Sequence, residues 1–519
     1  MADRGHLFVV QADLTRLAAD AFLIPCDSEL HVTGTWRPFV EPGAPWQAKH
    51  EWFRPEGVQL EDGVAVLPDP TPKDPSPDQV VGLRVLVDTV GVESIPAMVS
   101  RSLDAVRRAA ARATRHGGRA LPLVALPILG VGQGKFPGRR AEAVRELVGQ
   151  LLAFVTIHPV DVALTLRRTA DFAAAQWERQ RRTRDLGADF WPELTPEQGE
   201  LADELGTKAA HGELSVFAGA GVSRPVGFPS WKDLLQGLSP DQKLVFTEET
   251  DYPQVAQDLN RPDLNDEVAK KLTTGKHALA HALLVDLRTP SLVTTNYDPC
   301  FENAAIVIHQ DEPLRVIARQ LVIGGGPWLL KLHGDVAYPK TIVLTRGQYD
   351  ALENDLPALR GVVQTLMLTS HLLFVGFGFA DDDFLAMSQA AQKVRDLATD
   401  QPADAKAGTA IGLCPPKGRT YAELDYHHLR SDHDLTAAAR QLEILLDRVA
   451  WRCQIAGRGR ASYLLDPGYQ QDGTDQDRVL AEALTQLRAT AEQWQGSSGA
   501  QAVRDLMDDL GWQPSAADR

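Results

Sequence analysis

The chain has 519 residues, of which 44% are hydrophobic, and a formal net charge of -16 at pH 7. This length exceeds what one hydrophobic core organises, so we expect roughly two to four domains, and the acidic balance argues against nucleic acid or an anionic membrane as a direct partner. Four widely spaced cysteines, no signal-peptide pattern and no apolar run near ~20 residues predict a cytoplasmic protein with reduced thiols and no zinc site.

Apolar strand segments alternate with helical segments over the first part of the chain. Strands are expected at residues 7–10, 21–24, 64–67, 83–87, 121–126 and 162–166. Helices are expected at residues 96–116 and after Gly138, and either can cover a sheet. This order predicts an N-terminal α/β domain.

The composition changes around residues 176–200, where a strongly charged stretch precedes the capping-box pattern that runs from Thr195 to Gln198. We therefore place one domain at residues 1–190 and a second at residues 191–449. The arginines of the charged stretch are interpreted as a solvated helix face. The tail has a helical period, so residues 450–519 are predicted to form a helical C-terminal extension.

The second domain repeats the α/β pattern, and each of its strands runs into a polar or glycine-rich cluster. Strands are expected at residues 214–217, 292–294, 328–332, 372–375 and 410–413. Ligands of open parallel sheets bind beyond the carboxyl ends of the strands. The clusters are therefore the expected place for chemistry.

The first cluster places Gly219, Gly221 and Ser223 between a strand and a helical segment. Glycines there let the backbone approach a pyrophosphate, whose charge backbone N–H groups can meet at a helix start. The Rossmann spacing G-x-G-x-x-G is not met, because the third glycine is Gly227. A purely structural turn would explain the first two glycines about as well.

Two later clusters bring functional side chains to strand ends. Asn296 and Asp298 follow the strand at residues 292–294, where they can reach a ligand or, alternatively, cap the next helix. His333 follows the strand at residues 328–332. Histidine titrates near neutrality and can accept a proton from a ribose hydroxyl or from water. A fourth cluster, after residue 375, contains Gly376 and Gly378.

The four clusters together resemble the sirtuin family, and specifically its bacterial NAD-hydrolysing branch. The motif GAG-x-S-x-x-x-G-x-P is present from Gly219 to Pro229, followed by T-x-N-x-D and L-H-G, and the resemblance covers most of residues 212–449. It implies a Rossmann-like domain with a parallel sheet and a helical insertion, with NAD as the substrate and no metal.

The resemblance also implies roles for individual residues. Asn296 would hold the ribose hydroxyls or a water, Asp298 would position the nicotinamide, and His333 would be the general base. The residues expected to surround the rest of NAD are Gly219, Ala220, Gly221, Ser223, Gly227, Gly376 and Gly378.

Two departures from the deacetylases bear on the activity. Ser230, Trp231 and Lys232 stand where those enzymes have Asp-Phe-Arg, and the cysteine pairs of their zinc ribbon are missing. A protein deacylase or ADP-ribosyltransferase is therefore the less favoured alternative. A noncatalytic sensor that binds NAD or ADP-ribose is the second alternative.

The N-terminal domain resembles a macro domain, a fold that binds ADP-ribose, at residues 11–15, 20–24 and 127–137. The resemblance implies that Asp13 contacts adenine and that Gly130, Gly132 and Gly134 contact the distal ribose and phosphates. The family's Asn-Ala-Ala-Asn is replaced at residues 24–27, which argues against a hydrolase but allows a ligand sensor. A plain α/β domain with a glycine turn fits about as well.

These observations predict an NAD+ hydrolase that releases ADP-ribose and nicotinamide through His333 and Asn296. A helical lid over residues 232–287 is expected to exclude bulk water. From the resemblance we expect a regulated antiphage effector that depletes cellular NAD when a nucleotide or ADP-ribose-like activator reaches the N-terminal domain. A homo-oligomer is expected.

Overall fold

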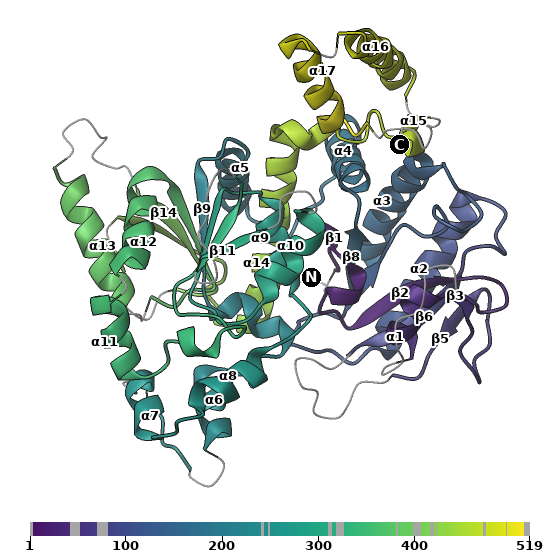
Figure 1. Cartoon of the computed structure of the whole chain (residues 1–519). Coiled ribbons are helices and arrows are strands. Elements are labelled where there is room, and N and C mark those ends of the chain that lie inside the picture. Colours follow the sequence, from purple (N-terminus) through teal and green to yellow (C-terminus); the bar gives the residue numbers. More distant parts are fainter. Residues whose placement is uncertain are drawn as a thin grey trace.

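The computed structural model describes residues 4–41, 52–69, 81–239, 243–247, 250–309, 314–317, 326–355, 357–379, 382–397, 406–415, 420–421, 423–470, 474–494 and 496–512. Two sheets, each covered by helices, lie side by side (Figure 1). The predicted fold class, two α/β units with a helical insertion and a helical C-terminal tail, is confirmed. Most of the proline-rich stretch at residues 67–79 lies outside the described residues.

The N-terminal sheet has the strand order β1-β8-β7-β2-β6-β5. Its strands are β1 (Leu7–Gln11), β2 (Ala21–Cys26), β5 (Val64–Val66), β6 (Leu83–Asp88), β7 (Leu123–Leu126) and β8 (Asp161–Leu166). Neighbours run parallel except β5 and β6, which are antiparallel. A short antiparallel pair, β3 (Val32–Thr33) and β4 (Trp52–Phe53), contacts α1 (Arg37–Val40) through Arg37, whose guanidinium lies over the Phe53 ring. The covering helices are α2 (Ile95–Arg112), α3 (Arg140–Ile157) and α4 (Thr169–Leu186), so α2 ends four residues before the predicted end at residue 116.

The second sheet has the order β11-β12-β10-β9-β13-β14-β15, with every neighbouring pair parallel. Its strands are β9 (Leu214–Ala218), β10 (Ser291–Thr294), β11 (Arg315–Ile317), β12 (Trp328–Lys331), β13 (His371–Val375), β14 (Gly408–Gly412) and β15 (Leu424–His428). After β9, the chain forms β10, β11 and β12 on one side of β9. It then crosses to the other side of β9, where it forms β13. This reversal opens a crevice at the carboxyl ends of the central strands. The sequence pattern missed β11 and β15, the two edge strands, whose side chains are partly exposed.

The helices of this half cover the sheet and extend from it. They are α5 (Pro196–Ala210), α6 (Trp231–Leu238), α7 (Tyr252–Asp258), α8 (Leu264–Leu272), α9 (Leu279–Asp286), α10 (Cys300–Ile308), α11 (Arg346–Asp355), α12 (Pro357–Thr369), α13 (Asp382–Arg395) and α14 (Leu435–Ala456). Helix α5 begins with the predicted capping box of Thr195 and Gln198. The insertion α6–α8 extends below the sheet in Figure 1.

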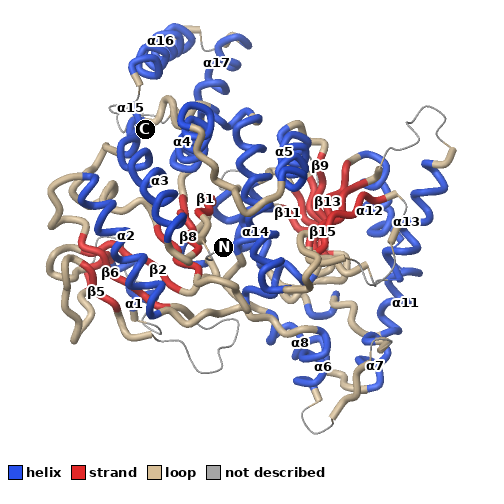
Figure 2. Tube along the Cα trace, turned by 180° about the vertical axis from the view of Figure 1, so that it is seen from behind, coloured by secondary structure: helices blue, strands red, loops and turns tan. Residues whose placement is uncertain are grey.

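A continuous hydrophobic core joins the two halves, because α9 and α14 pack between the sheets. Figure 2 shows α14 between the strands of the N-terminal sheet and those of the second sheet. Helix α14 contacts α5, α9, α4 and β1. The boundary proposed at residues 449 and 450 therefore falls inside this helix.

The charged stretch in α4 is not only a solvated face, and that part of the prediction was wrong. Arg179 is fully buried and forms an ion pair with Asp447 of α14, which is also fully buried. The reason is that α4 is covered by α14 on one side, so an arginine on that side must find an acidic partner. Arg184, later in the same helix, is exposed and pairs with Asp185.

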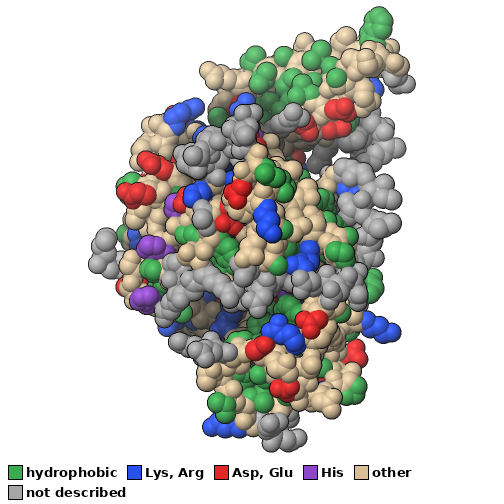
Figure 3. Space-filling view, turned by 90° about the vertical axis from the view of Figure 1, so that its left-hand side faces the viewer, with side chains coloured by type: hydrophobic (Ala, Val, Ile, Leu, Met, Phe, Trp, Pro, Cys, Tyr) green, Lys and Arg blue, Asp and Glu red, His purple; other side chains and the backbone are tan. Residues whose placement is uncertain are grey.

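The C-terminal helices α15 (Pro467–Gln470), α16 (Asp475–Glu492) and α17 (Ser498–Asp509) follow α14. In Figure 3 apolar side chains gather on the unit at the top of the molecule, where α16 and α17 lie. Exposed apolar residues on and next to these helices are Val479, Leu480, Leu487, Trp494 and Leu506. Among the described residues no helix combines the length and the apolar character needed to cross a membrane.

Candidate functional site

A cavity of about 760 Å³ lies at the carboxyl ends of β9, β10, β12 and β13. Its volume is in the range of small-molecule and cofactor sites. The predicted residues that line it are Ala220, Gly221, Ser223, Asn296, Asp298, His333, Gly376 and Gly378. The insertion contributes Trp231, Leu234, Tyr252 and Leu272, which enclose one side with apolar surface. Side chains far apart in sequence therefore share one cavity.

Two glycine-rich loops pack backbone against backbone beneath this cavity. The Gly219 N–H donates to the Val375 carbonyl, and the Gly221 N–H donates to the Gly376 carbonyl, both at 3.0 Å. A Cβ on Gly219 would lie 2.5 Å from the Gly376 carbonyl oxygen. These glycines therefore hold the two loops together, and Gly219 itself does not line the cavity. Gly227 does not line it either. This residue ends the 3-10 helix 220–226, in the left-handed region with φ of 97°.

Asn296 is oriented by hydrogen bonds to the first loop. Its side-chain Nδ2 donates to the Gly219 carbonyl at 3.1 Å and to Ser223 Oγ at 3.0 Å. A carbonyl oxygen can only accept, so the amide nitrogen must face Gly219. The side-chain oxygen of Asn296 is therefore the atom offered to a ligand.

Ser223 connects Asn296 to two further buried groups. Its hydroxyl lies 2.9 Å from Asp298 Oδ2 and 3.2 Å from His281 Nε2. Asp298 also accepts from the Cys300 N–H at 3.1 Å, so it caps the start of α10 as well as lining the cavity. Asp298 therefore lines the cavity and also accepts a bond from the first residue of α10. Asn296 does not cap that helix.

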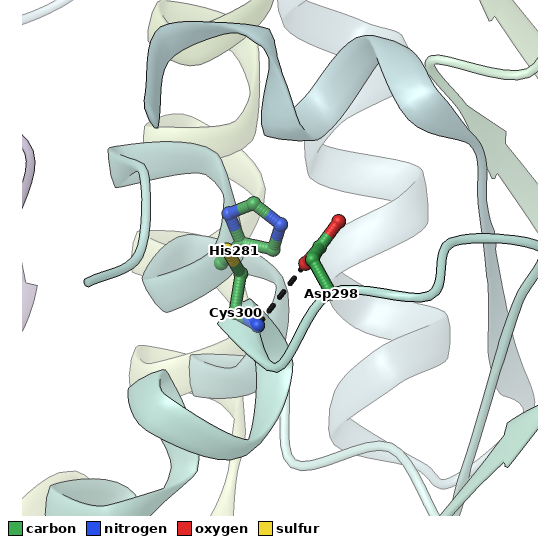
Figure 4. Close-up of side chains that lie close together, drawn as sticks. All are labelled: His281, Asp298 and Cys300. Carbon is green, nitrogen blue, oxygen red and sulfur yellow. Dashed lines mark hydrogen bonds between the residues drawn. The ribbon is translucent and has the colours of Figure 1, made fainter. Parts of the chain in front are cut away.

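His281, Asp298 and Cys300 lie close enough to be considered as metal ligands, with ligand atoms within 4.8 Å of one another (Figure 4). Both nitrogens of His281 already have partners, because Nδ1 accepts from the Ala278 N–H at 3.2 Å. Both oxygens of Asp298 have partners too. Burial lowers the pKa of His281 to about 4 and raises the pKa of the Cys300 thiol. The three side chains are accordingly assigned to a hydrogen-bond network.

Lys331, the last residue of β12, holds the loop that carries Asp298. Its buried ammonium donates to the carbonyls of Tyr297 at 3.0 Å and Asp298 at 2.7 Å, and to Glu302 at 2.9 Å. A lysine at the end of a buried apolar strand was the available sequence signal, but no role was assigned to it.

His333 is buried and lines the cavity two residues beyond the end of β12. Its Nδ1 lies 3.4 Å from the hydroxyl oxygen of Tyr349, and the two rings meet edge to face with centroids 5.1 Å apart. Tyr349 also lines the cavity from α11. Its partnership with His333 could not be read from the sequence, because the two residues lie on different elements.

The expected lid over residues 232–287 is only partly a cover of this site. Residues of α6, α7 and α8 line the cavity. Helix α9 does not, because its residues are buried between β1, α10 and α14. His281 belongs to this buried helix, and the one histidine within its apolar run was the sequence signal that was overlooked.

A second cavity of about 580 Å³ lies in the N-terminal domain. Asp13, Gly130, Gly132 and Gly134 all line it. The Asp13 carboxylate accepts from the N–H and the hydroxyl of Thr15 and lies 3.3 Å from Arg167, which also lines the cavity. The four residues singled out in this domain therefore lie around one space.

A family model matches part of the second half of the chain. Residues 290–416 match the SIR2-like domain family. This segment contains Asn296, Asp298, His333, Gly376 and Gly378.

Several relatives share about a third of the chain. The NAD(+) hydrolase ThsA of Acinetobacter baumannii is 27% identical over 36% of this chain and 40% of its own length. The ThsA of Bacillus cereus is 28% identical over 32% of this chain and 37% of its own length. Defense-associated sirtuin 2 of Bacillus subtilis is 23% identical over 35% of this chain and 19% of its own length. The chain thus spans less than half the length of these curated relatives.

Among solved structures, the chain is similar to an Oceanobacillus iheyensis macrodomain with ADP. The identity is 14%, the TM-score is 0.24, and the match covers 35% of this chain and 93% of the macrodomain.

Proposed function

We propose that the chain hydrolyses NAD+ to ADP-ribose and nicotinamide in the cavity at the end of the second sheet. The observation that carries the proposal is that Asn296, Ser223 and His333 line one cavity with the two glycine-rich loops. The SIR2-like match at residues 290–416 includes Asn296 and His333, and relatives that match about a third of the chain are named NAD(+) hydrolases. The glycine-rich loops have no side chain at Gly221, Gly376 and Gly378, so a pyrophosphate can approach their backbone closely.

The reaction replaces one bond at the anomeric carbon. The bond between ribose C1′ and the nicotinamide nitrogen breaks, and its electron pair goes to that nitrogen and neutralises the pyridinium. A water oxygen then bonds to C1′. We assign to Asn296 the acceptor oxygen that holds this water or a ribose hydroxyl, and to His333 the role of accepting the proton. Asp298 would position the nicotinamide.

The neighbours of His333 suit this role. In the tautomer whose Nδ1 carries the hydrogen and donates to Tyr349, Nε2 is the basic nitrogen. The apolar residues of α6 and α8 would limit the access of bulk water to the reacting carbon.

The test is nicotinamide release from NAD+ by the wild-type protein and by His333→Ala and Asn296→Ala. We expect each substitution to lower kcat by about a hundredfold or more. A matched control is His371→Ala, since His371 lies at the opposite end of β13. Equal release by all four proteins would refute the assignment of His333 and Asn296.

We further propose that the cavity of the N-terminal domain binds an activating nucleotide or an ADP-ribose-like molecule. Asp13 and the three glycines at its rim support this, and Arg167 supplies positive charge for a phosphate. The test of this site is titration calorimetry with ADP-ribose on the wild-type protein and on Asp13→Ala. Binding that Asp13→Ala leaves unchanged would refute this site.

The biological role that we propose is antiphage defence by depletion of cytoplasmic NAD. It is supported by the likeness of about a third of the chain to proteins named NAD(+) hydrolase ThsA and Defense-associated sirtuin 2. A homo-oligomer is part of the proposal, with the exposed apolar residues of α16 and α17 as the contact surface. Light scattering of the wild-type protein and of Leu480→Glu tests the assembly, and equal masses would contradict this surface.

A further inference from the structure

The hydrogen bonds around His281 fix the direction in which each group donates. The Ala278 N–H can only donate, so His281 Nδ1 must accept from it. The hydrogen of the neutral ring then sits on Nε2, and it is donated to Ser223 Oγ over 3.2 Å. The backbone at the start of α9 therefore selects the tautomer that His281 presents to the site.

Ser223 hydrogen-bonds to two cavity residues, Asn296 and Asp298, and the bond from His281 fixes which partner donates in each of these bonds. Its oxygen accepts from His281 Nε2 and from Asn296 Nδ2, which uses both of its acceptor positions. Its own hydrogen is then donated to Asp298 Oδ2 over 2.9 Å. With every position of the hydroxyl used, Asn296 is held with its side-chain oxygen available to a ligand and Asp298 is held as an acceptor.

The helix that carries His281 is held at both ends by the N-terminal domain. Before α9, the Ala18 N–H donates to the His277 carbonyl at 2.8 Å, and the His277 N–H donates to the Arg16 carbonyl at 2.9 Å. In the last turn of α9, Asp286 accepts from the backbone N–H of Gln11 at 3.1 Å. The partners that the N-terminal domain contributes to these bonds are Gln11, Arg16 and Ala18, and residues 12–15 between them line its cavity.

We propose that His281 is a positioning residue for Asn296 and Ser223, and that α9 transmits the state of the N-terminal domain to them. A ligand that moves residues 11–18 would move both anchors of α9, and His281 is the side chain on this helix that bonds to the site. The N-terminal domain thus acts on the proposed reaction through one buried helix. This inference rests on the proposed function for its kinetic consequence, but the geometry can be tested without turnover.

The first experiment compares His281→Leu with His281→Gln. Glutamine carries an acceptor oxygen and a donor nitrogen, so it can replace both bonds of the ring, whereas leucine replaces neither. We expect His281→Leu to lower kcat for NAD+ about tenfold with little change in KM, and His281→Gln to recover most of it. His371→Leu is the matched control, because His371 is partly buried and bonded to a hydroxyl, that of Thr409, but lies away from the cavity.

The second experiment measures backbone hydrogen exchange by mass spectrometry, which does not depend on catalysis. We expect His281→Leu and Asp286→Ala to exchange backbone hydrogens faster than the wild-type protein at residues 219–227 and 294–298. Asp286→Asn is the matched control for Asp286→Ala. Asparagine keeps an acceptor for the Gln11 N–H and should leave exchange unchanged. If the protein proves inactive on NAD+, changed exchange still supports the positioning role while the proposed function fails.

Three outcomes would overturn the inference. The first is a rate of hydrogen exchange in His281→Leu that equals the wild-type rate at residues 219–227 and 294–298. The second is a kcat of His281→Gln as low as that of His281→Leu. The third is a kcat of the His371→Leu control that falls as much as that of His281→Leu. If Asp286→Ala exchanges hydrogen at the wild-type rate in both segments, α9 does not connect the N-terminal domain to the site.

Discussion

Replacement of Arg179 by leucine should strongly destabilise the protein, because it removes the guanidinium that pairs with a buried carboxylate. Asp447 is fully buried on α14 and receives hydrogen bonds from Arg179, from Trp191 Nε1 at 2.7 Å and from the Val9 N–H at 3.3 Å. Burial alone would raise its pKa, but the charge of Arg179 and the bond to His6 outweigh burial and lower the pKa to about 2. The carboxylate is therefore charged at pH 7.

Removing one partner of a buried ion pair costs about 3–5 kcal/mol, since the remaining charge stays desolvated. The bonds from Trp191, Val9 and His6 remain in Arg179→Leu, so we expect the lower part of this range. The assay is urea unfolding at pH 7, followed by circular dichroism. The double variant Arg179→Leu with Asp447→Leu should regain part of the loss, because it removes both charges.

Arg184→Leu is the matched control on the same helix. Arg184 and Asp185 are both exposed, and solvent screens the attraction of such a pair, so we expect Arg184→Leu to leave the free energy of unfolding almost unchanged. If Arg179→Leu destabilises the protein no more than Arg184→Leu does, α4 and α14 are not packed through a buried ion pair, and the shared core described above is incorrect.

Three further predictions concern the site and its support. Lys331→Met removes the donor to two loop carbonyls and should lower kcat/KM for NAD+ about tenfold in a nicotinamide-release assay; an unchanged value would refute its role. Gly334→Ala should lower the melting temperature measured by calorimetry, because φ is +94° and a Cβ would lie 2.1 Å from the Thr341 carbonyl oxygen; an unchanged temperature would contradict this backbone geometry. Burial lowers the pKa of His277 and His281 to about 4, so the unfolded chain binds protons below pH 6.5 that the folded protein does not, and the urea midpoint should fall between pH 6.5 and 4. A midpoint that is constant over this interval would contradict the neutral, buried state of both rings.

The sequence was sufficient to locate the site because of how parallel sheets are built. A buried apolar run followed by glycine, asparagine or histidine marks the carboxyl end of a strand, and these ends meet at one edge. This rule and the resemblance to the sirtuin motifs together predict that Gly221, Asn296 and His333 share one crevice, and all three line the cavity. The central strands were also predictable, because their side chains are buried on both faces.

The features that were missed depend on contacts between distant elements. His281 lies in an apolar helical run, and its bond to Ser223 exists only because α9 packs beside the first glycine-rich loop. Arg179 lies in a run of charged residues that looks solvated, and its burial depends on α14, more than 250 residues later. Gly227 fits the family motif, yet its role is to end a 3-10 helix. Local periodicity contains no information about such partners.

The measurement that tests the account most directly is a crystal structure of His333→Ala with NAD+. We predict that the dinucleotide occupies the cavity of the second sheet, with the nicotinamide ribose within hydrogen-bond distance of the Asn296 side-chain oxygen and the pyrophosphate against Gly221. NAD+ bound only in the N-terminal cavity, or bound with its nicotinamide ribose away from Asn296, would contradict the proposed enzyme.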